Sequence, residues 1–304
     1  MDRPLATITP AKEALNAFGR PLPPPAPRPA RFAETLDALA ALDPRFMLAD
    51  RWSGETDDRF IASELTDAQL DRMIALRAAD LKTADLKIAA NMWFQWYCCR
   101  MTGPVLGGWM LHGRAPDVSA DNIAFRIDAE GRPQFAALIR PRVFARPGDR
   151  VEDLALTPTD DLKAAIVRTL LDGHLLPLGE RLKARYRLGA PIVRGTIASQ
   201  IGTVTTLIDA RTSLMWEQTA TALLDLLALA APQIDGLGRS GAPICVQGDG
   251  RTGTFYRRGT CCLVYRAPDR KKCGICPLTS EADRAAVYAE RLAARPQTPP
   301  IRAS

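Results

Sequence analysis

Four of the seven cysteines, Cys261, Cys262, Cys273 and Cys276, lie within sixteen residues in the pattern C-C-x10-C-x2-C. A C-x2-C turn allows two thiolates to converge on one metal ion. Adjacent cysteines on an extended strand instead point to opposite faces. A binuclear centre spreads over several ångströms and tolerates that divergence better than a single tetrahedral ion. The spacing therefore favours a [2Fe–2S] cluster held by four thiolates, and a zinc knuckle is the alternative.

The net charge of the chain, +6, is concentrated around these cysteines. Residues 251–276 hold seven basic residues and one acidic residue, whereas the two signs balance over the rest of the chain. Nearby positive charge favours the reduced, more negative form of a cluster and attracts an acidic redox donor or an anionic iron complex. The alternative is a solvated run of charges. The candidates for cluster tuning or docking are Arg257, Arg258, Arg266, Lys271 and Lys272.

The other residues with chemical potential have simpler structural explanations. Free cysteines are commonly buried as small hydrophobic residues, which we predict for Cys98, Cys99 and Cys245. Aromatic residues at helical spacing are more often core than pocket lining. That argument applies to Trp93, Trp96, Tyr97 and Trp109. The two histidines, His112 and His174, are isolated in the sequence and are predicted to be structural.

The composition, 47% apolar and 24% charged over 304 residues, is that of a soluble globular protein with a full core. It excludes a collagenous, wholly disordered or disulfide-scaffold chain. The N-terminal residues lack the apolar region of a secretory signal, and no apolar stretch reaches the roughly 20 residues that span a bilayer. The sequence therefore predicts no transmembrane segment and a cytoplasmic location, where thiols stay reduced.

The order of elements predicts an α+β fold, with a predominantly helical body, small antiparallel hairpins and a C-terminal iron–sulfur module. Eight of the 24 prolines lie in the first thirty residues, which indicates a polyproline-like or disordered lead. We therefore divide the chain into a Pro-rich lead over residues 1–30, a helical body over residues 31–242 and a cluster module with a terminal helix over residues 243–304.

Local sequence patterns predict where the helices and strands lie. A long helix is predicted from a capping box at Thr66 and Gln69 to a break at Gly103-Pro104. Another is predicted from Thr157, with Pro158 at its first position, to about residue 189, kinked near residues 173–177. The remaining helices are predicted at 32–42, 192–213, 216–229 and 279–294. Strands are predicted at 122–127 and 134–139, as a hairpin, and at 242–246 and 252–256.

The stretch from Arg257 to Leu278 resembles the C-terminal signature of the ferric iron reductase FhuF-like family. It has basic residues, then Cys-Cys-Leu-x-Tyr-Arg, a ten-residue gap and Cys-x-x-Cys-Pro-Leu. The rest of the chain resembles the family more weakly. Members often carry a Trp-Gly-Asn-like element, for which the nearest counterpart is the stretch Arg194-Gly195-Thr196-Ile197. The resemblance implies that Cys261, Cys262, Cys273 and Cys276 ligate a [2Fe–2S] cluster.

The resemblance also implies a cytosolic ferric-siderophore reductase, and we expect a siderophore of the hydroxamate type. Siderophore oxygens, as in hydroxamates, hold Fe(III) far better than Fe(II), so one electron converts a tight complex into a labile one. A ferredoxin-like or flavin donor would reload the cluster, because no nicotinamide-binding motif is present. No nucleic-acid partner is expected. The alternatives are a zinc-knuckle protein that contacts nucleic acid or a protein partner, and an iron–sulfur sensor.

Overall fold

The centre of the fold is a pair of long helices, α4 (Leu86–His112) and α7 (Ala190–Arg211), which pack along each other. The computed structural model describes residues 6–18, 29–53, 59–234 and 239–296. Helix α8 (Trp216–Ile234) packs on α7. The side chains of α4 are buried on almost every face, as expected for a helix with apolar residues all round.

Shorter helices surround this pair. Helices α2 and α3 both pack against α4, and α6 packs against α7. The bounds are α1 (Ala11–Phe18), α2 (Phe32–Leu42), α3 (Asp67–Asp80), α5 (Leu162–Ile166), a π-helix (Val167–Leu175), α6 (Leu176–Tyr186) and α9 (Glu281–Ala293). Short 3-10 helices lie at Pro44–Phe46, Ala62–Glu64, Ala120–Asn122 and Val264–Arg266.

Three small sheets flank the helices in the described part of the chain. The first joins β1 (Thr7–Pro10), β8 (Gly241–Gly248) and β9 (Arg251–Arg258), all antiparallel. The second joins β2 (Phe60–Ile61), β4 (Ile123–Ile127) and β5 (Pro133–Leu138), also antiparallel. The third joins β3 (Arg114–Pro116), β6 (Val143–Ala145) and β7 (Leu156–Pro158), and here β7 runs parallel to β6.

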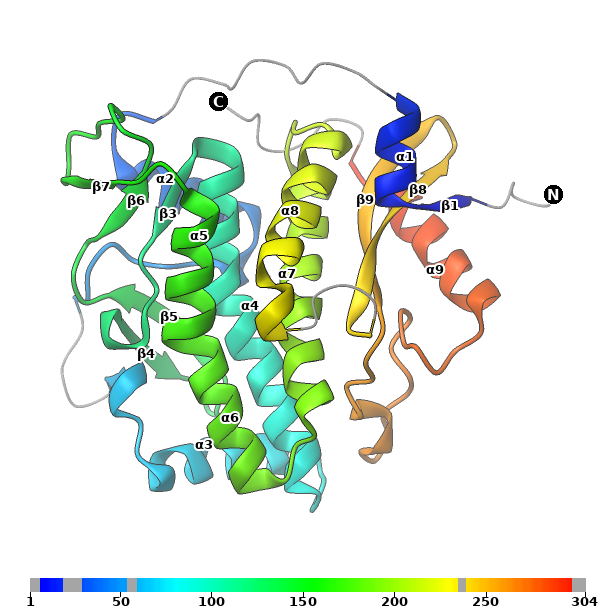
Figure 1. The fold of residues 1–304 in the computed structure, drawn as a ribbon. Helices are drawn as coiled ribbons and strands as arrows, with labels where there is room; N and C mark the ends of the chain where they lie inside the picture. Colours follow the sequence, from blue (N-terminus) through cyan, green and yellow to red (C-terminus); the bar gives the residue numbers. More distant parts are fainter. Residues whose placement is uncertain (1–5, 19–28, 54–58, 235–238, 297–304) are drawn as a thin grey trace.

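The β1-β8-β9 sheet lies between the central helices and α9 (Figure 1). Side chains alternate between the faces of a strand. Tyr256 of β9 therefore packs against α7, where a Cβ on Gly202 would lie 2.2 Å from its ring. Phe255 faces the other way and makes an edge contact with Tyr288 of α9, with ring centroids 5.6 Å apart. The sheet is thus buried on both faces and holds the residues that follow β9.

The α+β prediction is confirmed, as are several elements. Helix α2 has the predicted bounds, and the capping box of α3 forms, with both hydrogen bonds between Thr66 and Gln69. The hairpin β4–β5 and the strands β8 and β9 form within a few residues of their predicted bounds. Helices α7, α8 and α9 match the predicted C-terminal helices. Within the described ranges, no helix combines the length and the apolar character that crossing a bilayer requires.

The predicted disordered lead is wrong for residues 7–18, which form β1 and α1. Strand β1 adds to the edge of β8, and Ala11 and Ala14 are buried. The proline-rich run falls mainly on residues 19–28, outside the described residues. A strand that pairs through its main chain needs no particular side chains, so the composition of these residues did not indicate β1.

Two predicted helix boundaries are also wrong. The helix predicted from Thr66 is two helices, α3 and α4, and α4 continues through Gly103-Pro104 to His112. A Cβ on Gly103 would lie 2.2 Å from the Phe46 ring, so close packing with the residues after α2 explains the glycine. Thr157 and Pro158 lie in strand β7, and α5 begins only after Asp161, whose side chain caps it. The π-helix occupies the region of the predicted kink.

Candidate metal centre

The four clustered cysteines lie on the loop that leaves β9 and leads into α9. In Figure 1 this loop lies beyond the end of β9, between the sheet and α9. Part of it is the 3-10 turn Val264–Arg266, preceded by Leu263 at φ 65°. Asp269 also has a positive φ, 58°. The loop is therefore folded back on itself, and this brings the C-C pair and the C-x2-C pair together.

Contacts with the two central helices hold the start of this loop. The Asn91 side chain of α4 donates a 2.8 Å hydrogen bond to the carbonyl oxygen of Cys262. Its amide oxygen accepts a 2.8 Å hydrogen bond from the hydroxyl of Thr196 on α7. A Cβ on Gly195 would lie 2.3 Å from the Thr260 hydroxyl oxygen, so only glycine allows this approach. The family-like Arg194-Gly195-Thr196 stretch thus contacts the cysteine loop.

The four sulfurs meet as two pairs. The side chains of Cys262 and Cys273 hydrogen-bond to each other, as do those of Cys261 and Cys276. The hydrogen bond from Cys273 lowers the pKa of Cys262 to about 5 despite its burial. Burial raises the pKa of Cys261, and the Leu263 amide donates a 3.4 Å hydrogen bond to its sulfur. Neither pair is a disulfide.

This arrangement bears on which metal group the residues fit. Among the described residues, no three His, Cys, Asp or Glu side chains are grouped to ligate one metal ion. A two-iron centre places a pair of thiolates on each metal. Cys262 and Cys276 are buried, and Cys261 and Cys273 are partly exposed. The donor set of four reduced thiols in two pairs fits a [2Fe–2S] cluster.

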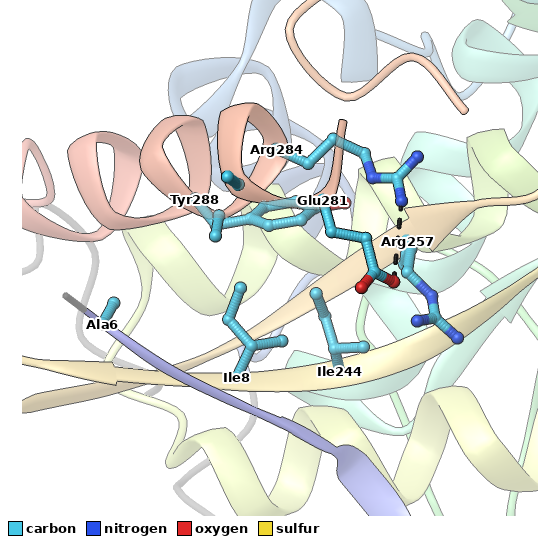
Figure 2. Close-up of a pocket in the computed structure, with 9 residues that line it drawn as sticks. Ala6, Ile8, Ile244, Arg257, Glu281, Arg284 and Tyr288 are labelled. Atoms are coloured by element: carbon cyan, nitrogen blue, oxygen red, sulfur yellow. Dashed lines mark ion pairs between the residues drawn. The ribbon is translucent and has the colours of Figure 1, made fainter. Parts of the chain in front are cut away.

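The structure places the predicted basic residues in different environments. Arg258 is turned inward, 8% exposed, and its charge helps to lower the pKa of Cys262. Arg257, its neighbour on β9, points to the other face of the sheet. There it lines a cavity of about 360 Å³ with Glu281, Arg284 and Tyr288 (Figure 2). Because successive strand residues face opposite ways, the two arginines cannot act on the same site.

The other basic residues of the loop face solvent. Arg266 is half-exposed, and its guanidinium lies 3.9 Å from the Asp85 carboxylate. Lys271 and Lys272 are exposed, and the Lys272 ammonium donates a 3.2 Å hydrogen bond to the Leu278 carbonyl oxygen. Exposed charges of this kind are well screened by salt. The predicted basic cluster is therefore one buried arginine with several exposed charges around it.

A groove adjoins the cysteine loop on the side of the helical body. It has a volume of about 300 Å³ and is bounded by α4, α7, the loop and α9. Cys273 and Ile275 form its wall on the loop side. Sequence reasoning did not single out two of its cationic residues, Arg45 and Arg291, because they lie far apart in the chain with no local motif. The other lining residues are Met92, Gln95, Trp96, Cys99, Gln200, Thr203 and Arg258.

Most of the remaining candidates lie in the core. Cys98, Cys99 and Cys245 are buried, and burial raises the pKa of Cys99 and of Cys245 to about 11. Their thiols are thus protonated at neutral pH. Trp93 and Tyr97 are fully buried, whereas Trp96 is partly exposed and lines the groove.

Both histidines are buried. The Nδ1–H of His174 donates to the Val118 carbonyl oxygen, which leaves Nε2 to accept a 2.6 Å hydrogen bond from the Tyr97 hydroxyl. Burial lowers the pKa of His174 to about 4, so the ring is neutral. His174 therefore joins α4 to the π-helix and serves the packing of the body.

Two family profiles match the chain. The profile described as "Ferric iron reductase FhuF-like transporter" matches residues 91–193, and the profile described as "FhuF 2Fe-2S C-terminal domain" matches residues 258–278. A search of curated proteins found no match to the chain. The resemblance inferred from the sequence is confirmed, and the cofactor of the C-terminal segment is a [2Fe–2S] cluster. The first match begins at Asn91 and the second at Arg258, two residues that lie at the cysteine loop.

Proposed function

From its match to the ferric iron reductase FhuF-like family, which supports ferric iron reduction in general, we propose that this chain is a ferric-siderophore reductase. The observation that carries the proposal is the groove beside the cysteine loop, with Cys273 on its wall. A ferric complex bound there would lie next to the residues that hold the redox group. The position of the groove beside the proposed cluster ligands therefore supports the proposal.

We propose Cys261, Cys262, Cys273 and Cys276 as the cluster ligands. Their thiols pair with one another, and Arg258 stabilises the thiolate form of Cys262. When bound, the [2Fe–2S] cluster supplies single electrons at a low potential. The paired, partly buried sulfurs keep the site compact, and the partly exposed Cys273 lines the groove.

The remaining task of the protein residues is to position the ferric complex and to balance the charges at the site. Hydroxamate and similar oxygen donors bind Fe(III) tightly and Fe(II) weakly, so one electron is enough to release the metal. The ferric complex gains that electron and leaves as Fe(II) and free siderophore. A ferredoxin-like or flavin protein, which gives up one electron per turnover, would restore the starting state. Arg257, Arg266, Lys271 and Lys272 are candidates for contacting an acidic donor, since all four are exposed.

We further propose a cytoplasmic location. All seven cysteines of the chain are free thiols, and three of them lie outside the proposed ligand set. Unpaired thiols persist in a compartment that keeps them reduced. A cytoplasmic site also suits the proposed reaction, because the donor proteins and the released Fe(II) are both kept reduced there.

Anaerobic purification followed by absorption and EPR spectra of the reduced protein tests the cofactor. We expect iron and labile sulfide at two per chain, visible charge-transfer bands and an EPR signal after one-electron reduction. Zinc without sulfide or colour would refute the proposal. Stopped-flow mixing with ferric siderophores then tests turnover, and we expect the reduced bands to reoxidise. If the protein holds the cluster but transfers no electron to any ferric siderophore, the reductase proposal fails and the iron–sulfur sensor alternative stands.

A further inference from the structure

We propose that the groove beside the cysteine loop selects ferric complexes that carry net negative charge. The inference rests on the proposed reductase function and adds the class of its substrate. The groove encloses about 300 Å³, within the range of small-molecule sites. A groove of this volume fits a small ligand, and we assign it to one.

The first observation is a buried positive charge in the wall of the groove. Arg258 lines the groove and is only 8% exposed. Its Nε is buried without a hydrogen-bond partner, and no carboxylate of the described chain pairs with its guanidinium. A buried guanidinium is stabilised by negative groups around it, and an anionic ligand in the groove would be one of them. The proposed cluster ligands lie on one side of Arg258, and the Nε–H of Arg258 has no hydrogen-bond partner among the described residues.

The second observation is the sign of the remaining lining. Arg45 and Arg291 also line the groove, whereas its lining residues include no Asp or Glu. Asp43 holds Arg45 through a pair of hydrogen bonds and so fixes its guanidinium in place. Arg291 is exposed and, in the described ranges, forms no ion pair. Asp43 neutralises Arg45, so Arg258 and Arg291 are the groups that favour an anionic ligand and disfavour a cationic one.

The third observation is room for a ligand larger than a simple anion. A second cavity of about 310 Å³ lies between α7, β9 and α9, and it shares Thr203, Ile275 and Arg291 with the groove. The two cavities therefore adjoin each other along α7. The groove also offers apolar surface from Met92 and Trp96, against which flat rings can pack. An adventitious inorganic anion would use neither feature.

These observations distinguish between classes of siderophore. A tris-hydroxamate ligand neutralises the three charges of Fe(III) and gives a neutral complex. Catecholate and hydroxycarboxylate ligands carry more charge, and their ferric complexes are anionic. The arginines therefore favour the second class, which differs from the hydroxamate class expected from the sequence. Because Cys273 and Arg258 lie in the same wall, the anionic complex would be held against the cluster side of the groove.

Binding can be measured without electron transfer by using gallium. Ga(III) has the charge and coordination of Fe(III) but is not reduced under these conditions. We would titrate the full holoprotein anaerobically with a Ga(III) tris-catecholate and a Ga(III) tris-hydroxamate by isothermal titration calorimetry. We expect the catecholate complex to bind at least about tenfold more tightly, and raised salt to weaken only that complex.

Arg258→Gln and Arg291→Gln should each weaken the catecholate complex by about tenfold and leave the hydroxamate complex nearly unchanged. Arg258→Lys, which keeps the charge, should restore part of the affinity. Arg257→Gln is the matched control, because Arg257 is the adjacent residue on the opposite face of β9. Arg291 is exposed, so its variant remains informative if Arg258→Gln fails to fold.

The outcomes separate this inference from the proposed function. Equal affinity for both gallium complexes, or equal losses in Arg257→Gln and Arg258→Gln, would overturn the anionic selectivity while leaving the reductase function standing. Reoxidation of the reduced cluster by both ferric complexes at equal rates and equal half-saturating concentrations would do the same. If neither ferric complex reoxidises the cluster, the reductase proposal fails, and the gallium titrations still decide whether the groove binds anionic chelates.

Discussion

The amide nitrogen of Asn91 lies 2.8 Å from the carbonyl oxygen of Cys262, across 171 positions of the sequence. Asn91 is fully buried, and the partner of its amide oxygen is the Thr196 hydroxyl. One side chain thus ties α4, α7 and the cysteine loop together. The helical body therefore shapes the loop directly and is more than a scaffold to which a separate module is attached.

Replacing Asn91 should loosen the cysteine loop. Asn91→Ala leaves the Cys262 carbonyl and the Thr196 hydroxyl buried without partners, at a cost of about 1–3 kcal/mol. We expect lower iron and sulfide content and faster cluster loss in the presence of a chelator. Thr196→Ser keeps the hydroxyl and serves as the control. An Asn91→Ala protein with full cluster content and unchanged cluster lifetime would show that the hydrogen bond does not matter to the loop.

Serine substitution distinguishes the proposed ligands from the core cysteines. Cys276→Ser should lose or weaken the cluster, and Cys262→Ser should do so as well, because oxygen is a poorer ligand for these irons. Absorption and EPR spectra after anaerobic reconstitution provide the measurement. Cys245→Ala, which changes a buried thiol of β8, should keep the native spectrum. Native spectra in both ligand variants would contradict the proposed ligation.

The close approach of α7 to the loop gives a steric prediction. In Gly195→Ala the new methyl would lie 2.3 Å from the Thr260 hydroxyl oxygen, so the loop must move. We expect a loss of stability of about 1–3 kcal/mol and reduced cluster content. Gly189→Ala is the control, because its nearest neighbour would be the Pro191 ring at 3.7 Å. Similar behaviour of the two variants in urea unfolding and iron analysis would argue against a role for this contact.

The features that the sequence could predict are those with a local cause. The apolar spacing of α2, the Thr66–Gln69 capping box and the β4–β5 hairpin each arise within a dozen or so residues. The cysteine spacing likewise indicated the metal site, since the ligand spacing of a metal loop is a local property. Such signals do not depend on the rest of the fold.

The features that it could not predict depend on contacts between distant residues. Pro104 stays inside α4 because the helix is fixed by its packing, as at Gly103 against Phe46. The groove joins Arg45, Trp96 and Arg291, which share no motif. One overlooked signal was present: Gly195 and Gly202 lie seven residues apart on one face of α7, and both allow close approach of β9 or its loop.

Burial of His174 gives a pH-dependent stability. Its pKa falls from 6.5 to about 4 on folding, so the folded state resists protonation that the unfolded state accepts. The neutral ring therefore contributes its full stability above pH 6.5. This contribution declines as the pH falls toward 4, by at most about 3 kcal/mol. Urea unfolding between pH 7 and pH 5 should show the decline.

Two variants test whether His174 causes this decline of stability with falling pH. His174→Gln removes the titrating group and should flatten the profile over this range, whatever its own stability. Tyr97→Phe removes the hydroxyl that donates to Nε2 but leaves the ring buried, so it should retain the slope. An unchanged slope in His174→Gln would mean that other groups cause the pH dependence.

The two kinds of positive charge at the cysteine loop should tune the potential differently. Removing a positive charge disfavours the reduced, more negative cluster and so lowers its midpoint potential. Lys271 and Lys272 are exposed. In a Lys271→Gln/Lys272→Gln protein the midpoint potential should decrease by a few tens of millivolts at most. This decrease should vanish as salt rises, because the Debye length shrinks from about 10 Å at 0.1 M. Arg258 is 8% exposed, so the decrease in Arg258→Gln should be larger and persist in high salt. Redox titration monitored by EPR at low and high salt measures both. Equal salt dependence in the two proteins would mean that burial of Arg258 does not set its influence on the cluster.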